Sequence, residues 1–247
     1  MRGCEAVSVE SAGERIGRCL LVGLDDLPAD LGEPSAVVVI DVIRAFTTAV
    51  AVFEAGAAEI RCVAGLDEAR ALATSLPGSL LIGEERGVAP AGFDAGNSPI
   101  DLGGHDWVGR TVVQRTSNGT RGLARFAGAA VVLAAAAANV GATAAWVRDN
   151  TVGAVLVVGT GSTTGDLDCG RRLAELIAGG APDQGELGAA VTAAADQHRG
   201  FWSRRRSGGE VAAFLADIDA CARVDSSAMV LVGHAVDGAV VLRPWVS

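Results

Sequence analysis

Short β-branched runs alternate with segments of helical length along most of this 247-residue chain. Six runs are expected as strands: 36–40, 59–63, 79–83, 111–114, 130–133 and 154–158. Apolar runs of four or five residues bounded by turn residues are typical of strands buried on both faces, and the pieces between them are long enough for helices. The alternation predicts a three-layer α/β/α fold around a mostly parallel or mixed sheet.

The pattern changes after this alternating region. Two helix-like segments and two apolar runs close the chain, at 186–197, 208–222, 228–233 and 238–244. Because no solenoid-type repeat or low-complexity linker interrupts the sequence, we expect one compact α/β domain over residues 1–247, with a helical appendage near 180–225. Length alone leaves two tightly packed lobes as an alternative.

Composition narrows the class of partner. The chain carries a net charge of −9 with a pI near 4.8, which argues against a nucleic acid or an anionic membrane as partner. Its one basic cluster, residues 204–206, is followed at once by Ser and Gly and is expected to be a solvated loop. Lysine is absent, so an anionic small molecule would be bound by arginine or by backbone N–H groups.

The cysteines and the termini indicate a cytoplasmic protein. Five scattered cysteines with no Cys-x-x-Cys pair are typical of reduced thiols, and the N-terminus lacks the apolar region of a secretory signal. Residues 127–147 are uncharged and long enough to span a membrane. Their Ala/Gly character and Asn139 favour a buried strand that leads into a buried helix.

Polar side chains directly follow four of the expected strands. They are Asp41 and Arg44; Glu84, Glu85 and Arg86; Arg115, Thr116, Ser117 and Asn118; and Asp166, after the turn 159–165. Ligands bind where the carboxyl ends of parallel strands meet, so we expect these side chains to gather at one edge of the sheet. Carboxylates and hydroxyls suit Mg²⁺, and arginines suit an anion, which together favour phosphoryl chemistry.

Each of these residues also has a purely structural interpretation. Asp41 could cap the helix that follows it, and Arg44 could lie on the surface. Residues 116–120 could form an ordinary Asn-Gly turn with a helix cap. The isolated histidines and Cys169 are assigned no catalytic role.

The segment 159–166, GTGSTTGD, follows a strand and opens a helix. It lacks the Lys-Ser/Thr of a phosphate loop, and its glycines do not match the Gly-x-Gly-x-x-Gly spacing of a dinucleotide site. Its backbone amides could still contact an anion at the helix N-terminus.

Four stretches together resemble the 2-phosphosulfolactate phosphatase family: VVVIDVIRAFTT, GEERG…GFDAGNSP, RTSNGTRGL and the region of Asn139. The resemblance covers roughly residues 35 to 180. It implies an α/β phosphatase that uses Mg²⁺ and hydrolyses 2-phosphosulfolactate to sulfolactate and phosphate, in the biosynthesis of coenzyme M. The oligomeric state stays open, and a homodimer is compatible with such an enzyme.

The resemblance also implies roles for residues. Asp41, Glu85 and Asp166 are expected to be catalytic and to hold Mg²⁺. The residues expected to bind substrate are Arg44, Arg86, Asn97, Ser98, Thr116, Asn118, Gly119, Thr120 and Arg121. Three of these are arginines, which suits a substrate with phosphate, carboxylate and sulfonate groups.

The fourth family motif departs from the expected residues. Family members carry Cys-Ala-Gly and Glu-Asp there, whereas this chain has Gly159-Thr160-Gly161 and Gly165-Asp166. Since Asp166 is kept, we expect hydrolysis to be retained. The alternative hypothesis is a non-catalytic paralogue that binds the anion without turning it over.

Overall fold

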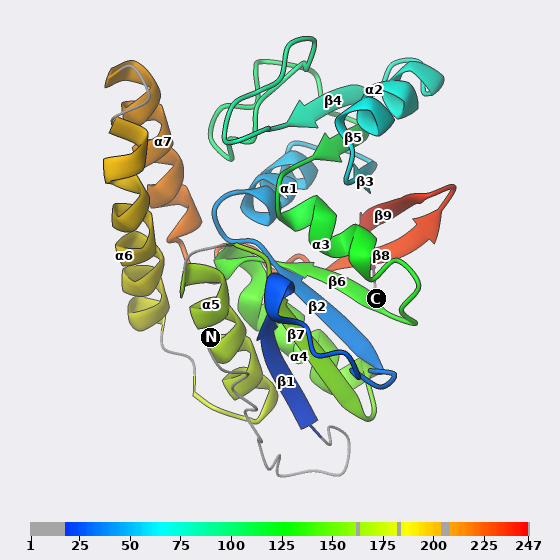
Figure 1. Cartoon of the computed structure of the whole chain (residues 1–247), viewed down its shortest axis with the longest axis vertical. Coiled ribbons are helices and arrows are strands. Elements are labelled where there is room, and N and C mark those ends of the chain that lie inside the picture. Colours follow the sequence, from blue (N-terminus) through cyan, green and yellow to red (C-terminus); the bar gives the residue numbers. More distant parts are fainter. Residues whose placement is uncertain (1–17, 162–163, 182–183, 204–207, 247) are drawn as a thin grey trace.

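The computed structural model describes residues 18–161, 164–181, 184–203 and 208–246 (Figure 1). The basic cluster at 204–206 and Cys4 lie outside the described residues. The other four cysteines are free and buried.

A nine-stranded mixed sheet forms the centre, in the order β1-β7-β2-β6-β8-β9-β3-β5-β4. Its strands are β1 Arg18–Gly23, β2 Ala36–Ile40, β3 Glu59–Val63, β4 Leu80–Gly83, β5 Thr111–Arg115, β6 Val132–Ala135, β7 Ala154–Gly159, β8 Leu231–Val236 and β9 Ala239–Pro244. The helices are α1 Ala45–Glu54, α2 Leu66–Ser75, α3 Gly119–Arg125, α4 Val140–Asn150, α5 Thr164–Ile177, α6 Gln184–Ser203 and α7 Gly208–Cys221. Two short 3₁₀ turns, η1 Leu24–Asp26 and η2 Ala137–Asn139, complete the described elements.

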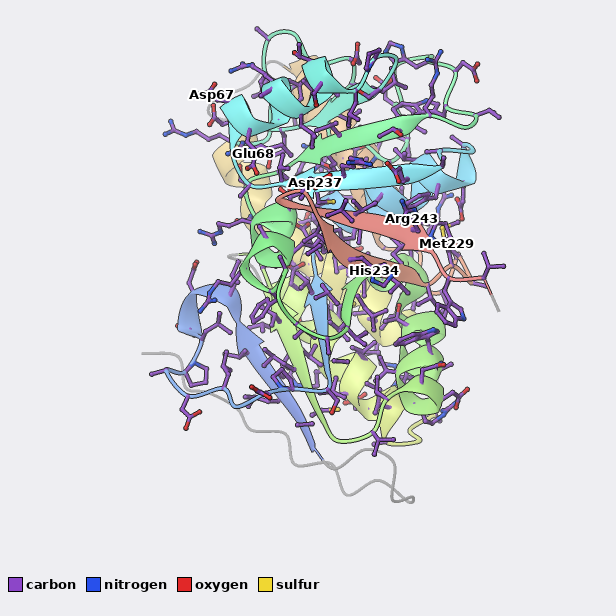
Figure 2. All side chains as sticks on the ribbon, turned by 90° about the vertical axis from the view of Figure 1, so that its right-hand side faces the viewer. Asp67, Glu68, Met229, His234, Asp237 and Arg243 are labelled. Carbon is purple, nitrogen blue, oxygen red and sulfur yellow. The ribbon has the colours of Figure 1, made fainter. Side chains whose placement is uncertain are left out.

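The sheet contains two parallel groups separated by a hairpin. Strands β1, β7, β2 and β6 are parallel to one another, and so are β3, β5 and β4. The β8–β9 hairpin lies between them and pairs antiparallel with both (Figure 2, where His234, Asp237 and Arg243 mark it). The sheet is strongly twisted, and β4 and β5 are steeply inclined to β2 and β7 in Figure 1.

Helices cover both faces of the sheet, which confirms the expected three layers. One face packs against α1 and α3, through core residues such as Val39, Phe46 and Leu123. The other face packs against α4 and α5, for example through Ile40 and Leu173, and farther along the sheet against α2. Helix α6 packs on α5, and α7 on α6, so the expected helical appendage is a pair of helices beside the sheet (Figure 1).

Two sequence expectations need correction. Strand β1 was not expected, although its core CLLV is apolar; it pairs with β7 at the edge of the sheet. Strand β6 begins at Val132, two residues later than expected, because pairing with β2 sets its register. The interpretation of residues 127–147 as a strand that leads into a helix is confirmed, since they contribute to β6, η2 and α4. No helix within the described part of the chain is long and apolar enough to cross a bilayer.

Candidate active site

Asp41 directly follows β2 and is almost fully buried. The backbone N–H of Ala45 donates to its Oδ1 at 3.0 Å, and the N–H of Gly119 also bonds to the carboxylate. A Cβ on Gly119 would lie 2.9 Å from Asp41 Oδ2, so only glycine lets the start of α3 approach this closely. The carboxylate is therefore held by backbone from both parallel groups of the sheet.

Asp166, in the first turn of α5, is the second buried acid. The N–H of Val42 donates to its Oδ1 at 2.8 Å, and the N–H of Gly161 donates to Oδ2 at 2.6 Å. Asp166 thus binds the backbone that follows β2 as well as the backbone that follows β7. The two acids are connected through the segment 41–45.

Thr160 lies between the two acids. Its Oγ1 is 3.0 Å from the carbonyl oxygen of Ile40, 3.4 Å from Asp41 Oδ2 and 3.5 Å from Asp166 Oδ2. A hydroxyl has one proton, so it can donate to only one of these three acceptors at a time. The remaining oxygen lone pairs face one another and repel, and a bound cation or a proton between them would reduce this repulsion.

The environment makes both acids hard to ionise. Burial raises the pKa of Asp41 to about 6, and the negative charge of nearby Glu84 adds to the rise. Burial together with the charge of Asp41 raises the pKa of Asp166 to about 8. Two carboxylates with displaced pKa values at strand ends are typical of a functional site.

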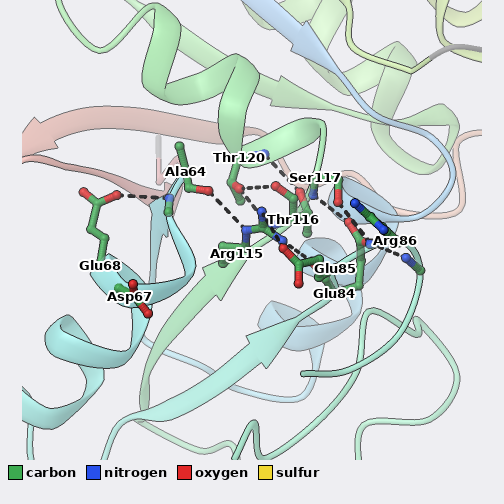
Figure 3. A network of polar contacts seen from close by, with 12 residues as sticks. Ala64, Asp67, Glu68, Glu84, Glu85, Arg86, Arg115, Thr116, Ser117 and Thr120 are labelled. Atoms are coloured by element: carbon green, nitrogen blue, oxygen red, sulfur yellow. Dashed lines mark hydrogen bonds and ion pairs between the residues drawn. The ribbon is translucent and has the colours of Figure 1, made fainter. Parts of the chain in front are cut away.

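Glu84, not Glu85, is the buried acid at the end of β4. Its carboxylate accepts hydrogen bonds from the N–H of Gly87 and from the N–H and hydroxyl of Ser117 (Figure 3). Arg115 supports the same turn by donating to the carbonyl oxygens of Glu84 and Ala64. The side chain of Glu84 therefore fixes the loop after β4 against the start of α3.

Glu85 is placed differently from the sequence expectation. Its side chain is 50% exposed, and its carboxylate lies 3.9 Å from the guanidinium of Arg115. Within the described ranges, no group of three or more His, Cys, Asp or Glu side chains is arranged to hold a metal ion. The expected cluster of Asp41, Glu85 and Asp166 is therefore not assembled. Arg86 adopts a left-handed backbone, with φ of +52°, in an exposed position.

The donor set around Thr160 nevertheless suits Mg²⁺. It consists of two carboxylates and a hydroxyl, all hard oxygen ligands, and Mg²⁺ in proteins is commonly held by one or two carboxylates while it keeps several waters. The like charges forced together at Asp41 and Asp166 would be compensated by a divalent cation. Asp41, Asp166 and Thr160 are thus the residues that fit this cofactor.

The sequence of the chain was compared with known proteins. A family model described as 2-phosphosulpholactate phosphatase matches residues 24–235. The chain belongs to this family. Residues 24–235 include both acids, the loop after β4, α3 and both helices of the helical pair, α6 and α7.

Several curated proteins of the 2-phosphosulfolactate phosphatase family are similar to this chain. The "Probable 2-phosphosulfolactate phosphatase" of Gloeobacter violaceus is 35% identical over 166 residues, which cover 65% of this chain and 70% of that protein. The protein of the same name from Deinococcus radiodurans is 46% identical over 112 residues, 44% of this chain and 47% of its own length. A protein of the same name from a Synechococcus strain is 39% identical over 132 residues, which cover 53% of this chain and 54% of that protein. The chain thus spans about half the length of the last two.

The third family motif, RTSNGTRGL, shapes the turn before α3 and supplies a backbone amide to the site. Thr116 and Thr120 bond to each other, hydroxyl to backbone in both directions, and are fully or almost fully buried. They fix the turn in which Asn118 precedes α3. Gly119 supplies the amide that reaches Asp41. Arg121 is half exposed and forms an ion pair with Asp25 at 3.0 Å.

The second motif ends at a buried corner. Asn97 is buried, and its Oδ1 has no hydrogen-bond partner within the described part of the chain. The hydroxyl of Ser98 donates to Asp217 Oδ1 at 2.5 Å, and Arg44 bonds to Asp217 Oδ2 at 2.6 Å. Two residues expected to bind substrate are thus joined by an acid from α7.

Two residues of this site, Thr160 and Asp217, were not expected from the sequence, and Glu84 was expected at this edge of the sheet but was given no role. The signal for Asp217 was available, since it shares one face of α7 with Phe214, Ile218 and Cys221, all buried. An acid on the apolar face of a helix needs a partner. Within 159–161, Gly161 is the residue that agrees with the family motif, and a Cβ on it would lie 2.7 Å from Asp166 Oδ2. Neither the geometry nor the family match favours the non-catalytic alternative.

Proposed function

We propose that this protein is a phosphatase that hydrolyses 2-phosphosulfolactate to sulfolactate and phosphate, with Mg²⁺ as its cofactor. The family match and the names of the relatives support the reaction. One observation carries the proposal for this chain: Asp41 and Asp166 are buried together around Thr160, each fixed by backbone N–H groups. A site of this kind suits a divalent cation, and its carboxylates suit a reaction with a phosphate ester.

Asp41 is the residue to which we assign the reaction itself. Burial raises the pKa of Asp41 less than that of Asp166, so Asp41 is the acid of the pair that ionises first, and its carboxylate can attack phosphorus or remove a proton from an attacking water. The hydrogen bonds from Ala45 and Gly119 hold it in one orientation before substrate binds. Trapping with borohydride separates the two routes, because only direct attack of the Asp41 carboxylate on phosphorus forms an acyl phosphate that borohydride reduces.

Asp41, Asp166 and Thr160 would hold Mg²⁺. When bound, the ion would neutralise charge on the phosphoryl oxygens and favour the ionised form of both acids. Glu84 and Ser117 keep the loop after β4 in place beside them. Arg86 is assigned to the anionic groups of the substrate, whereas Asn97 is assigned to the hydroxyl of the product, from which its amide oxygen can accept a hydrogen bond.

A cytoplasmic location, a homodimeric assembly and a place in coenzyme M biosynthesis belong to the same proposal. They rest on the family resemblance and on the acidic composition with scattered cysteines.

The test is release of phosphate from 2-phosphosulfolactate by the purified protein, first with Mg²⁺ and then with EDTA. 2-Phospholactate, which lacks the sulfonate, is the comparison substrate. We expect metal-dependent release that is faster for the sulfonated compound. Absence of release from both compounds would refute the proposed function, and equal rates would remove 2-phosphosulfolactate as the specific substrate.

A further inference from the structure

Asp217 lies on α7, outside the motifs that define the site, yet it contacts two of their residues. Its carboxylate accepts from Arg44 Nη1 at 2.6 Å and from the Ser98 hydroxyl at 2.5 Å. Arg44 follows β2, and Ser98 belongs to the corner that ends the loop after β4. One carboxylate therefore joins three parts of the chain that are far apart in sequence.

The contact is buried and constrains Arg44. The side chains of Arg44 and Asp217 are only 11% and 3% exposed. Arg44 Nη2 also donates to the carbonyl oxygen of Gly87, and the guanidinium lies 5.3 Å from the ring centroid of Phe214. Because Nη1 and Nη2 both donate hydrogen bonds and an aromatic ring lies beside them, the guanidinium of Arg44 is fixed in one orientation, unlike that of a surface arginine.

The backbone of the same segment bonds to both acids of the site. Arg44 lies between Val42, whose N–H binds Asp166, and Ala45, whose N–H binds Asp41. A shift of Arg44 toward or away from α7 would therefore move backbone that holds both acids. Ile43 packs against Ala195, Phe214 and Ile218 of α6 and α7, which strengthens this connection.

Asp217 also neutralises the positive charge of Arg44. A buried guanidinium paired with a carboxylate contributes almost no net charge, so Arg44 attracts an anion less than an unpaired arginine would. Product phosphate has to leave the site after each turnover, so tight binding of phosphate by an unpaired Arg44 would not increase the rate.

We propose that Asp217 is a positioning residue of the phosphatase site: it orients Arg44 and Ser98, and it cancels the charge of Arg44. Helix α7 is then part of the site. This inference rests on the proposed function for its kinetic consequence, whereas its effect on anion binding can be measured separately.

Three variants separate position from charge. Asp217→Asn removes the charge, and Asp217→Glu keeps the charge but moves the carboxylate by one methylene group. Asp219→Asn removes an exposed acid from the same helix and is the control. Each is compared with wild type for kcat and KM on 2-phosphosulfolactate, for calorimetric binding of inorganic phosphate, and for the urea midpoint of unfolding.

The inference predicts a different result for each variant. In Asp217→Asn, kcat falls on the order of tenfold because Arg44 and Ser98 lose their fixed arrangement. Phosphate binds about tenfold more tightly in the same variant, because Arg44 is no longer neutralised. Asp217→Glu loses kcat with phosphate affinity within about twofold of wild type, and Asp219→Asn changes neither quantity.

A purely structural ion pair gives another pattern. Asp217→Asn would then unfold at lower urea, while kcat and phosphate affinity of the folded protein would equal those of wild type, and that result overturns the inference. If Asp217→Asn does not fold, Asp217→Glu decides, since it keeps Arg44 paired, and an unchanged kcat in that variant overturns the inference. If wild type releases no phosphate, the proposed function fails, and unchanged phosphate affinity in Asp217→Asn would still refute the charge role.

Discussion

Gly119 and Asp41 are in such close contact that a single methyl group on Gly119 would lie 2.9 Å from Asp41 Oδ2 and 2.8 Å from the Cβ of Ala45. The contact joins the start of α3 to the end of β2, and with it the two parallel groups of the sheet. The site depends on this contact because the Gly119 amide is one of the donors that fix the carboxylate.

Gly119→Ala should therefore damage both stability and activity. The added methyl group pushes α3 away from Asp41, and overpacking of this kind costs about 1–3 kcal/mol of unfolding free energy. We expect kcat for phosphate release to fall at least about tenfold, since the displacement also removes a fixed hydrogen bond. Gly128→Ala is the matched control, because its new Cβ meets nothing within 4 Å. Equal activity of the two variants would contradict the role of this contact.

Neighbouring glutamates should behave differently when each is changed to glutamine. Glu84→Gln leaves one of the donors of Gly87 and Ser117 without an acceptor, which costs about 1–3 kcal/mol, and it loosens the loop beside Asp41. Glu85→Gln removes only a half-exposed contact with Arg115, worth less than about 1 kcal/mol. Urea unfolding and phosphate release measure both variants. A larger loss of activity in Glu85→Gln would restore Glu85 as the functional acid.

Thr160→Val tests the place assigned to the cofactor. The change keeps the shape of the side chain and removes the oxygen that lies 3.4 and 3.5 Å from the two acids. The carbonyl of Ile40 keeps a hydrogen bond from the Thr160 N–H, so stability should change by less than about 1 kcal/mol. The Mg²⁺ concentration for half-maximal activity should rise about tenfold. Thr192→Val, in an exposed position on α6, is the control, and an unchanged Mg²⁺ requirement would argue against Thr160 as a ligand.

Without a metal ion, folding stability should fall as the pH rises from about 4 to about 8. Unfolded aspartate ionises near pH 3.9, whereas burial raises the pKa of Asp41 to about 6 and that of Asp166 to about 8. In this window the unfolded state binds fewer protons than the folded state, so the free energy of unfolding decreases with pH. Urea midpoints in EDTA across the window measure this. Asp166→Asn should flatten the curve, and added Mg²⁺ should raise stability most at the alkaline end. A midpoint that rises through the window would contradict the buried acid pair.

The parts of the site predicted from sequence are those set by local structure. Asp41 was found because AVVVI is a strand buried on both faces, and the residue after such a strand lies at the edge where ligands bind. Asp166 was found in the same way, from β7 and the turn that follows. The three layers followed from the alternation of apolar runs with helical segments.

The parts that were not predicted depend on contacts between distant segments. Which of Glu84 and Glu85 turns inward is decided by the pairing of the chain after β4 with Arg115, where the Glu84 N–H bonds to the Arg115 carbonyl at 3.0 Å. Arg44 and Asp217 are 173 residues apart, so no local pattern could join them. The reversal of direction between the two parallel groups depends on the β8–β9 hairpin, which enters the middle of the sheet from the end of the chain.

The central claim is that Asp41 and Asp166 form the reactive centre of a Mg²⁺-dependent phosphatase. The most direct measurement is the rate of phosphate release from 2-phosphosulfolactate, with Mg²⁺ present, for wild type, Asp41→Asn, Asp166→Asn and the exposed control Asp149→Asn. We predict that both buried variants lose at least about a hundredfold in kcat while the control keeps the wild-type rate. Wild-type activity in Asp41→Asn, measured on folded protein, would contradict the account.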